Sequence, residues 1–168
     1  MPGYFLDTSA LAKLYHPEIG SERMESLVQA PGTRLIISQL SLIEIQSVFA
    51  TKVRTGVIDK VALDQLRGRF FSDLAKGRFE VVLPARRHFQ SAETLVRTHA
   101  VDYALRTLDA MQLSVALHLH RRGAASDLVA SDKNLCNVAA PEGLNVINPS
   151  GGLVAGTSST VHQSPERK

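Results

Sequence analysis

The sequence predicts an α/β domain, in which helices cover both faces of a central, mostly parallel sheet. Short apolar runs alternate with helical patterns along residues 3–149, and such alternation is typical of parallel sheets. Two long amphipathic helices with only a short link between them also predict a helical hairpin within the domain.

The individual elements follow from apolar periodicity, caps and turn residues. Short runs of apolar and β-branched residues indicate strands at 5–6, 35–38, 79–83, 128–130 and 145–147. Apolar stripes at helical spacing indicate helices at 10–15, 21–29, 41–55, 59–76, 84–99, 107–122 and 133–140.

Local signals define the predicted helical hairpin. Ser41 followed by Glu44 matches the capping-box pattern, so we expect the helix 41–55 to begin at Ser41. Gly56 ends that helix, and Asp59 caps the next one. In the later helix 84–99, Phe89 is expected to face the core.

Composition is that of an ordinary globular protein of 168 residues, and we predict one domain over residues 1–149. Residues 150–168 are rich in Gly, Ser and Thr and are expected to form a flexible tail. The net charge of +3 suits a phosphate-rich partner without requiring one. No long apolar stretch or signal peptide is present and Cys136 is the only cysteine, so we expect a cytoplasmic protein without membrane association.

Four acidic residues are predicted to meet at one edge of the sheet. Asp7 and Asp132 each follow a strand and precede a helix, where ligands bind in parallel α/β sheets. Glu44 and Asp109 lie on inward-facing stripes of their helices, where an unpaired carboxylate is costly. Asp127 precedes its strand and is therefore expected at the opposite edge.

Each acid also has a simpler explanation. Asp7 and Asp132 are typical N-caps, Asp109 suits a helix N-terminus, and Glu44 could close a capping box. These explanations do not account for four acids at one edge, and no buried Arg or Lys partner is evident in the sequence. Clustered carboxylates repel one another, and a bound divalent cation would explain why they lie together. Oxygen ligands favour Mg²⁺ or Mn²⁺. The histidines are interpreted as isolated surface or helix-end residues.

Four segments resemble the signature segments of PIN-domain ribonucleases, and among these most resemble the VapC-type toxins of bacterial type II toxin–antitoxin modules. The segments are 5–11 (FLDTSAL), 41–45 (SLIEI), 105–110 (LRTLDA) and 128–132 (LVASD). They occur in order, with the helical hairpin between the second and third, and the resemblance covers about residues 3–149. It implies a PIN-like three-layer α/β/α fold.

The resemblance also implies a function, namely a metal-dependent endoribonuclease whose products carry a 5′-phosphate and a 3′-hydroxyl. The residues that match the family's catalytic and metal-binding positions are Asp7, Glu44, Asp109 and Asp132. They would hold one or two Mg²⁺ or Mn²⁺ ions. Thr8 or Ser131 could orient a metal-binding carboxylate by forming a hydrogen bond with it.

The partners that the resemblance implies are an RNA substrate, a small antitoxin that covers the active site and a second copy of the chain in a homodimer. Substrate-binding residues cannot be assigned from the sequence, although Arg86, Arg87 and Arg106 could help to hold RNA. Two alternatives stay open. The chain could be a catalytically inactive PIN-like module that binds RNA or protein, or a DNA-directed nuclease of the flap-nuclease kind, which the absence of DNA-clamping insertions disfavours.

Overall fold

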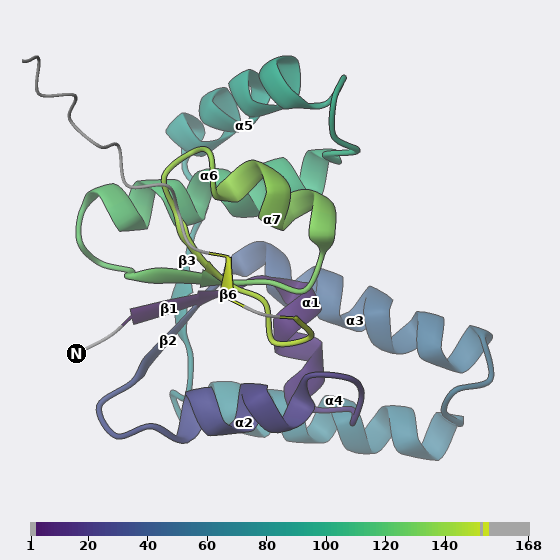
Figure 1. The fold of residues 1–168 in the computed structure, drawn as a ribbon. Coiled ribbons are helices and arrows are strands. Elements are labelled where there is room, and N and C mark those ends of the chain that lie inside the picture. The colour runs from purple at the N-terminus through teal and green to yellow at the C-terminus, as the bar shows by residue number, and fades with distance from the viewer. Residues whose placement is uncertain (1–2, 152, 155–168) are drawn as a thin grey trace, which may run out of the picture.

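A six-stranded sheet lies between two layers of helices in the computed structural model, which describes residues 3–151, 153 and 154 (Figure 1). The strand order is β3-β2-β1-β4-β5-β6, and every neighbouring pair is parallel except β5 and β6. The strands are β1 (Gly3–Leu6), β2 (Arg34–Ser38), β3 (Glu80–Val82), β4 (Asp127–Val129), β5 (Asn145–Ile147) and β6 (Leu153–Val154). The predicted, mostly parallel sheet is confirmed.

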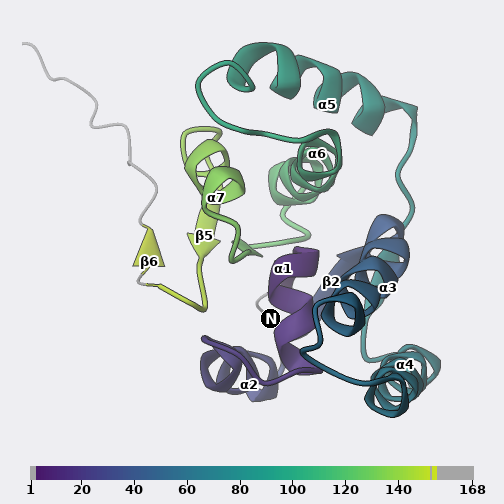
Figure 2. The ribbon, with the colours of Figure 1, turned by 90° about the vertical axis from the view of Figure 1, so that its right-hand side faces the viewer.

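The helices divide into two groups along the chain, one on each face of the sheet (Figure 2). The first group contains α1 (Thr8–Leu11), the 3-10 turn η1 (Ala12–Leu14), α2 (Ser21–Gln29), α3 (Gln39–Arg54) and α4 (Lys60–Ala75). The second contains α5 (Arg86–His99), α6 (Thr107–Arg121) and α7 (Lys133–Ala139).

Two hydrophobic cores hold these layers together, because successive strand residues point to opposite faces of a sheet. Phe5, Ile36 and Leu128 pack in the core that includes α5, α6 and α7. The adjacent residues Leu6 and Val129 pack in the core that includes α1 to α4. The expected three-layer α/β/α architecture is therefore present.

Strand β1 lies between β2 and β4, where the direction of strand addition along the sheet reverses. Such a switch point opens a crevice at the carboxyl ends of the strands, where α/β proteins bind their ligands. The Asp7 N–H donates to the Val129 carbonyl at 2.9 Å, so the ends of β1 and β4 are joined directly. This end of the sheet is the predicted location of the acids.

The predicted helical hairpin consists of α3 and α4, which lie side by side (Figure 2). Gly56, with a φ of 72°, follows the end of α3, and glycine reaches this backbone conformation without strain. Asp59 caps α4 as expected, since its carboxylate accepts the Ala62 N–H at 2.8 Å.

The start of α3 differs from the prediction. Strand β2 leads directly into the helix, and the N-cap is Ser38, whose hydroxyl accepts the Leu40 N–H at 3.2 Å. The predicted capping box of Ser41 and Glu44 is therefore wrong. Ser41 instead is buried within the first turn of α3, and Glu44 is free for another role.

Helix α5 begins at Arg86 rather than at residue 84, and the face that it turns to the core is shifted from the predicted one. Phe89 is 58% exposed, whereas His88 is 2% exposed. His88 Nδ1 accepts the Ala85 N–H at 2.7 Å, and its ring packs edge-on against His118 with 5.1 Å between centroids. His88 is therefore a helix-end residue, as interpreted, but it is buried and packed rather than isolated at the surface.

The chain continues in the sheet beyond the boundary predicted at residue 149. Leu153 and Val154 pair with β5 as the antiparallel strand β6, and the Ser150 hydroxyl donates to the Ile19 carbonyl at 3.0 Å. The rest of the predicted tail, residues 152 and 155–168, lies outside the described residues. In the part of the chain that is described, no helix is long and apolar enough to cross a membrane.

Candidate active site

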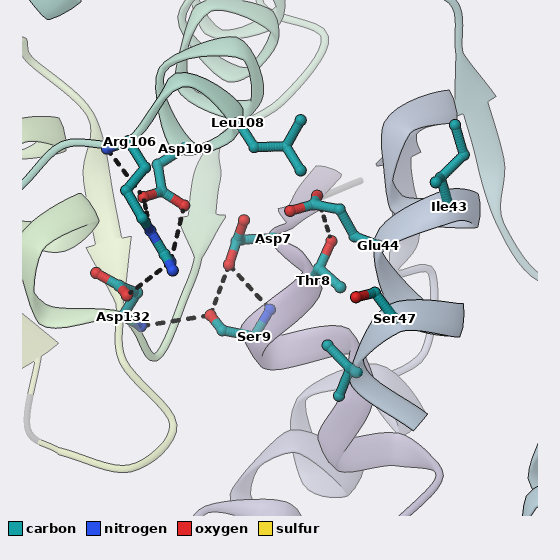
Figure 3. Close-up of a pocket in the computed structure, with 11 residues that line it drawn as sticks. Asp7, Thr8, Ser9, Ile43, Glu44, Ser47, Arg106, Leu108, Asp109 and Asp132 are labelled. Atoms are coloured by element: carbon teal, nitrogen blue, oxygen red, sulfur yellow. Dashed lines mark hydrogen bonds and ion pairs between the residues drawn. The ribbon is translucent and has the colours of Figure 1, made fainter. Parts of the chain in front are cut away.

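A cavity of about 440 Å³ opens at the carboxyl ends of β1 and β4, and all four predicted acids line it (Figure 3). The lining residues are Asp7, Thr8, Ser9, Ile43, Glu44, Ser47, Val48, Arg106, Leu108, Asp109 and Asp132. We call this cavity the acid pocket. Asp127 stands at the other end of its strand, as its first residue, and does not line the pocket.

Asp7 lies at the base of the acid pocket, directly after β1 and before α1. It is 5% exposed, and its Oδ2 accepts the Ser9 N–H at 2.9 Å and the Ser9 hydroxyl at 2.6 Å. Asp7 therefore does cap α1, as the simpler explanation required. Burial is the largest influence on this carboxyl group and raises its pKa, and the nearby Asp109 carboxylate adds to the rise, against the lowering by Ser9.

Ser9 ties the ends of β1 and β4 together, a role that sequence reasoning missed. Its hydroxyl donates to Asp7 and accepts the N–H groups of Ser131 at 2.9 Å and Asp132 at 3.3 Å. Asp132 then caps α7 through the Leu135 N–H, at 3.0 Å. One side chain thus fixes the relative positions of two acids that lie far apart in the sequence.

The hydroxyl oxygen of Ser131, predicted as a possible support for a carboxylate, lies 3.4 Å from the hydroxyl oxygen of Ser150. The hydroxyl that contacts a carboxylate at this end of β4 belongs to Ser9. Thr8 is different, because its hydroxyl donates to Glu44 Oε2 at 2.8 Å. That contact is of the kind expected for Thr8, and its importance for catalysis stays a prediction.

The half-buried Glu44 is held by three buried polar side chains, Thr8, Ser41 and Gln112, and we call these four residues the amide cluster. Gln112 is fully buried on α6, and its Nε2 donates to Glu44 Oε2 and to the hydroxyls of Ser41 at 2.9 Å and Thr8 at 3.2 Å. An ionised carboxylate only accepts hydrogen bonds, so the NH₂ group of the Gln112 side chain, rather than its carbonyl oxygen, must face Glu44. Sequence reasoning missed Gln112, although it follows Asp109 by three residues on a largely apolar helix.

The surroundings of Glu44 disfavour the ionised form of its carboxyl group. Burial is the largest influence and raises its pKa, and the carboxylates of Asp7 and Asp109 raise it further. The hydrogen bonds from Gln112 and Thr8 act in the opposite direction. Glu44, like Asp7, is therefore a carboxylate whose ionised form would gain from a nearby cation.

Arg106 connects the other two acids, in what we call the arginine bridge: Arg106, Asp109 and Asp132. The Arg106 Nε donates to Asp109 Oδ2 at 3.0 Å, and Nη2 lies 3.4 Å from Asp109 Oδ1 and 3.6 Å from Asp132 Oδ2. Asp109 Oδ2 also accepts the backbone N–H of Arg106 at 3.2 Å. Asp109 therefore does bind a free backbone N–H at the N-terminus of α6. The pKa of Arg106 is raised by Asp109 first, and then by Asp132 and Glu44.

The arginine bridge provides a cationic partner for two of the acids, although the sequence showed no buried Arg or Lys partner beside them. The partner of Asp109 precedes it by three residues, and its side chain is 74% exposed rather than buried. Of the three arginines predicted to hold RNA, Arg106 lines the acid pocket. Arg86 and Arg87 begin α5 and are not among the lining residues.

The donor set of the acid pocket fits a hard divalent cation. Its four carboxylates supply only oxygen ligands, and Arg106 is the one basic residue among the residues that line it. In the described residues, no three His, Cys, Asp or Glu side chains stand close enough together to hold a metal ion as they are now oriented. A cation shared by three acids would therefore require their side chains to move closer together.

Comparisons with known proteins agree with this architecture. The family model for the PIN domain matches residues 4–141. Among solved structures, the chain is similar to VapC20 from Mycobacterium tuberculosis, described as a toxin that cleaves the sarcin–ricin loop. The identity is 19% and the TM-score 0.57, over 80% of this chain and 93% of that one.

Two further solved structures are similar to about the same degree, and the second of them is described as a toxin–antitoxin complex. One is VapBC2 from Rickettsia felis bound to a DNA fragment from its promoter, with 20% identity and a TM-score of 0.56 over 87% of this chain and 98% of that one. The other is a complex from Klebsiella pneumoniae, with 19% identity and a TM-score of 0.53 over 87% and 97%. Such low identities establish the fold alone. No curated protein sequence matches the chain.

Proposed function

Since the chain belongs to the PIN-domain family, we propose that it is a metal-dependent endoribonuclease and acts as the toxin of a toxin–antitoxin pair. The observation that carries this proposal is the common pocket of Asp7, Glu44, Asp109 and Asp132 at the switch point of the sheet. Helix capping explains the position of three of these acids singly, but not why four line one cavity.

In this proposal the four carboxylates hold one or two Mg²⁺ or Mn²⁺ ions. Bound there, the cation would supply a water of lowered pKa and would stabilise negative charge on the scissile phosphate. The amide cluster keeps the Glu44 carboxylate oriented towards the pocket, and Ser9 keeps Asp7 and Asp132 at a fixed separation. The apolar side chains of Ile43, Val48 and Leu108 form a wall beside the acids, against which part of the substrate can rest.

The proposed substrate is RNA, and the proposed partner is an antitoxin protein. The net charge of +3 suits a polyanionic substrate, and the similar VapC20 is described as a toxin that cleaves the sarcin–ricin loop. One of the similar structures is described as a toxin–antitoxin complex, which supports an antitoxin partner. A homodimer and a cytoplasmic location follow from the family resemblance and stay predictions.

The test is cleavage of total RNA by the purified protein, freed of antitoxin, with Mg²⁺, with Mn²⁺ and with EDTA. We expect cleavage in either metal, none in EDTA, and a loss of at least about 100-fold in Asp7→Asn and Asp109→Asn, because each removes a charged oxygen ligand. Asp127→Asn is the matched control, since this acid stands at the opposite end of β4, and it should retain full activity.

The possible outcomes separate the proposal from its alternatives. Cleavage that survives in both pocket variants would disprove the site. RNA binding without cleavage in any metal would instead support an inactive binding module. Cleavage of DNA in preference to RNA would favour the flap-nuclease alternative.

A further inference from the structure

The arginine bridge occupies the side of the acid pocket where carboxylate oxygens would bind a cation. Arg106 contacts acids from two different elements, Asp109 in the first turn of α6 and Asp132 at the start of α7 (Figure 3). Both carboxylate oxygens of Asp109 lie within 3.4 Å of guanidinium nitrogens. The guanidinium thus engages the oxygen atoms that a metal ion on this side of the pocket would use.

The charge balance of the pocket favours a cation beside its acids. Asp109 is 7% exposed and Asp7 5% exposed, and an ionised carboxylate at such depth is costly without a compensating charge. Arg106 is the one basic residue lining the pocket, and it is influenced by Asp109, Asp132 and Glu44 together. It therefore serves as the counter-ion when no metal is bound.

A guanidinium and a divalent cation compete for these carboxylates. Magnesium requires oxygen ligands at about 2.0–2.1 Å in near-octahedral geometry, so it takes up lone pairs that now face the guanidinium N–H donors. The two cations also repel each other. Binding of one must therefore weaken binding of the other by the same factor, as linkage requires.

The geometry of Arg106 makes such an exchange easy. Its side chain is 74% exposed, so the guanidinium can move into solvent without disturbing a packed core. Its backbone N–H keeps its own hydrogen bond to Asp109, so the start of α6 retains one contact while the side chain swings away. By contrast, Lys13 is 8% exposed and Lys52 15% exposed in their ion pairs with Glu18, which offer no comparable freedom.

We propose that Arg106 is an internal counter-ion of the acid pocket, which holds Asp109 and Asp132 in the metal-free protein and is displaced when a divalent cation binds. The inference rests on the proposed function, because it requires that the pocket bind a metal. It adds that metal affinity is set in part by competition with the protein's own arginine.

The first experiment is a calorimetric titration of the full, antitoxin-free chain with Mn²⁺. Arg106→Gln removes the competitor and should lower the Kd for Mn²⁺ by roughly two- to fivefold, the size expected for an exposed ion pair. Arg97→Gln is the matched control, because Arg97 is 77% exposed and pairs with Glu93 on α5, and its Kd should equal that of the unaltered protein. Thermal unfolding in EDTA confirms that both variants are folded.

The second experiment follows the Arg106 Nε–H resonance by NMR during a Mg²⁺ titration, with Arg106→Lys to assign the signal. We expect the resonance to move to the position of a free arginine in step with metal binding. This measurement distinguishes displacement of the Arg106 side chain from a general effect of its positive charge on metal affinity. An altered Kd in Arg106→Gln with an unmoved resonance would overturn the proposal.

Failure of this inference and failure of the proposed function give different results. If Mn²⁺ binds equally to the unaltered protein and to Arg106→Gln, the pocket is a metal site but Arg106 does not compete, and this inference alone is wrong. If Mn²⁺ binds to neither, the metal site itself is wrong, and both proposals fall.

Discussion

The two sides of the acid pocket hold their carboxylates in different ways. On the side of α3, Glu44 is held by the amide cluster, whose donor Gln112 is fully buried. On the side of α6 and α7, Asp109 and Asp132 are joined by Arg106, whose side chain is 74% exposed. A buried network of hydrogen bonds fixes a geometry, whereas an exposed ion pair is weak and easily exchanged. The comparison indicates a pocket with one fixed side and one adjustable side.

The largest expected effect comes from removing the buried donor on the fixed side. Gln112→Ala leaves Glu44, Ser41 and Thr8 without their shared donor and opens a cavity, so we expect the free energy of unfolding to fall by about 2–3 kcal/mol. Loss of orientation at Glu44 should lower RNA cleavage by roughly 10- to 100-fold. Urea unfolding and the cleavage assay measure the two effects.

The control for this prediction is Gln90→Ala, since Gln90 is exposed on α5. It should change neither stability nor activity. If Gln112→Ala behaved like the control, the fixed side of the pocket would not depend on the amide cluster.

The next effect concerns Ser9, which joins the two sides at the base of the pocket. Ser9→Ala removes the hydrogen bond to Asp7 and leaves the N–H groups of Ser131 and Asp132 without their acceptor. We expect the free energy of unfolding to fall by about 1–2 kcal/mol. Ser26→Ala, which removes an exposed hydroxyl on α2, should be neutral in the same urea titration; equal curves for the two variants would contradict the role given to Ser9.

A smaller effect, of opposite sign, is expected at Glu44 in metal-free protein. Burial raises its pKa in the folded state, so the folded form holds its proton to higher pH than the unfolded form does. The resulting stability is fully present below the unfolded pKa and is lost as the pH rises through the folded pKa.

Glu44→Gln should therefore stabilise the folded protein at pH 7, by less than about 1 kcal/mol because Thr8 and Gln112 also bond the charged form. This gain should disappear at a pH below the unfolded pKa, where Glu44 is protonated in both states. Melting temperatures in EDTA across this pH range measure the difference. If the variant were less stable than the original protein at pH 7, the folded state would not disfavour the ionised form of Glu44.

The smallest effect on stability is expected on the adjustable side. Arg106→Gln should change the free energy of unfolding by no more than about 0.5 kcal/mol, since exposed ion pairs contribute little. The change should shrink further at high salt, which screens exposed charges. A salt-independent loss of more than about 2 kcal/mol in urea titrations would show that the arginine bridge is a rigid structural element, and the contrast between the two sides would not hold.

The sequence predicted the layers and strands because their patterns are local. Apolar runs such as 35–38 and helical stripes such as 60–75 follow directly from the spacing of buried residues. Two predictions, the start of α3 and the buried face of α5, were wrong because each depends on tertiary packing. Ser38 and Ser41 are both good N-caps, and tertiary packing rather than propensity decided between them. At α5, His88 is buried against His118, whereas Phe89 is exposed.

The acids themselves were predictable, but the groups that hold them were not. Asp7 and Asp132 follow strands, so topology alone brings them to one edge of the sheet. Gln112 contacts Ser41 and Glu44 across a separation of about 70 residues, and no local pattern reports such a contact. Arg106 was expected to hold RNA, and its pairing with Asp132 depends on how α6 and α7 pack.

The central claim is that the carboxylates of the acid pocket share a divalent cation. Anomalous diffraction from a crystal grown with Mn²⁺ tests it most directly, because manganese can be located without assuming its ligands. The account predicts a peak in the acid pocket, within about 2.0–2.3 Å of oxygen atoms from at least two of the four carboxylates, with Arg106 turned away from Asp109. A protein that cleaves RNA in Mn²⁺ but shows its manganese peak outside the pocket would contradict it.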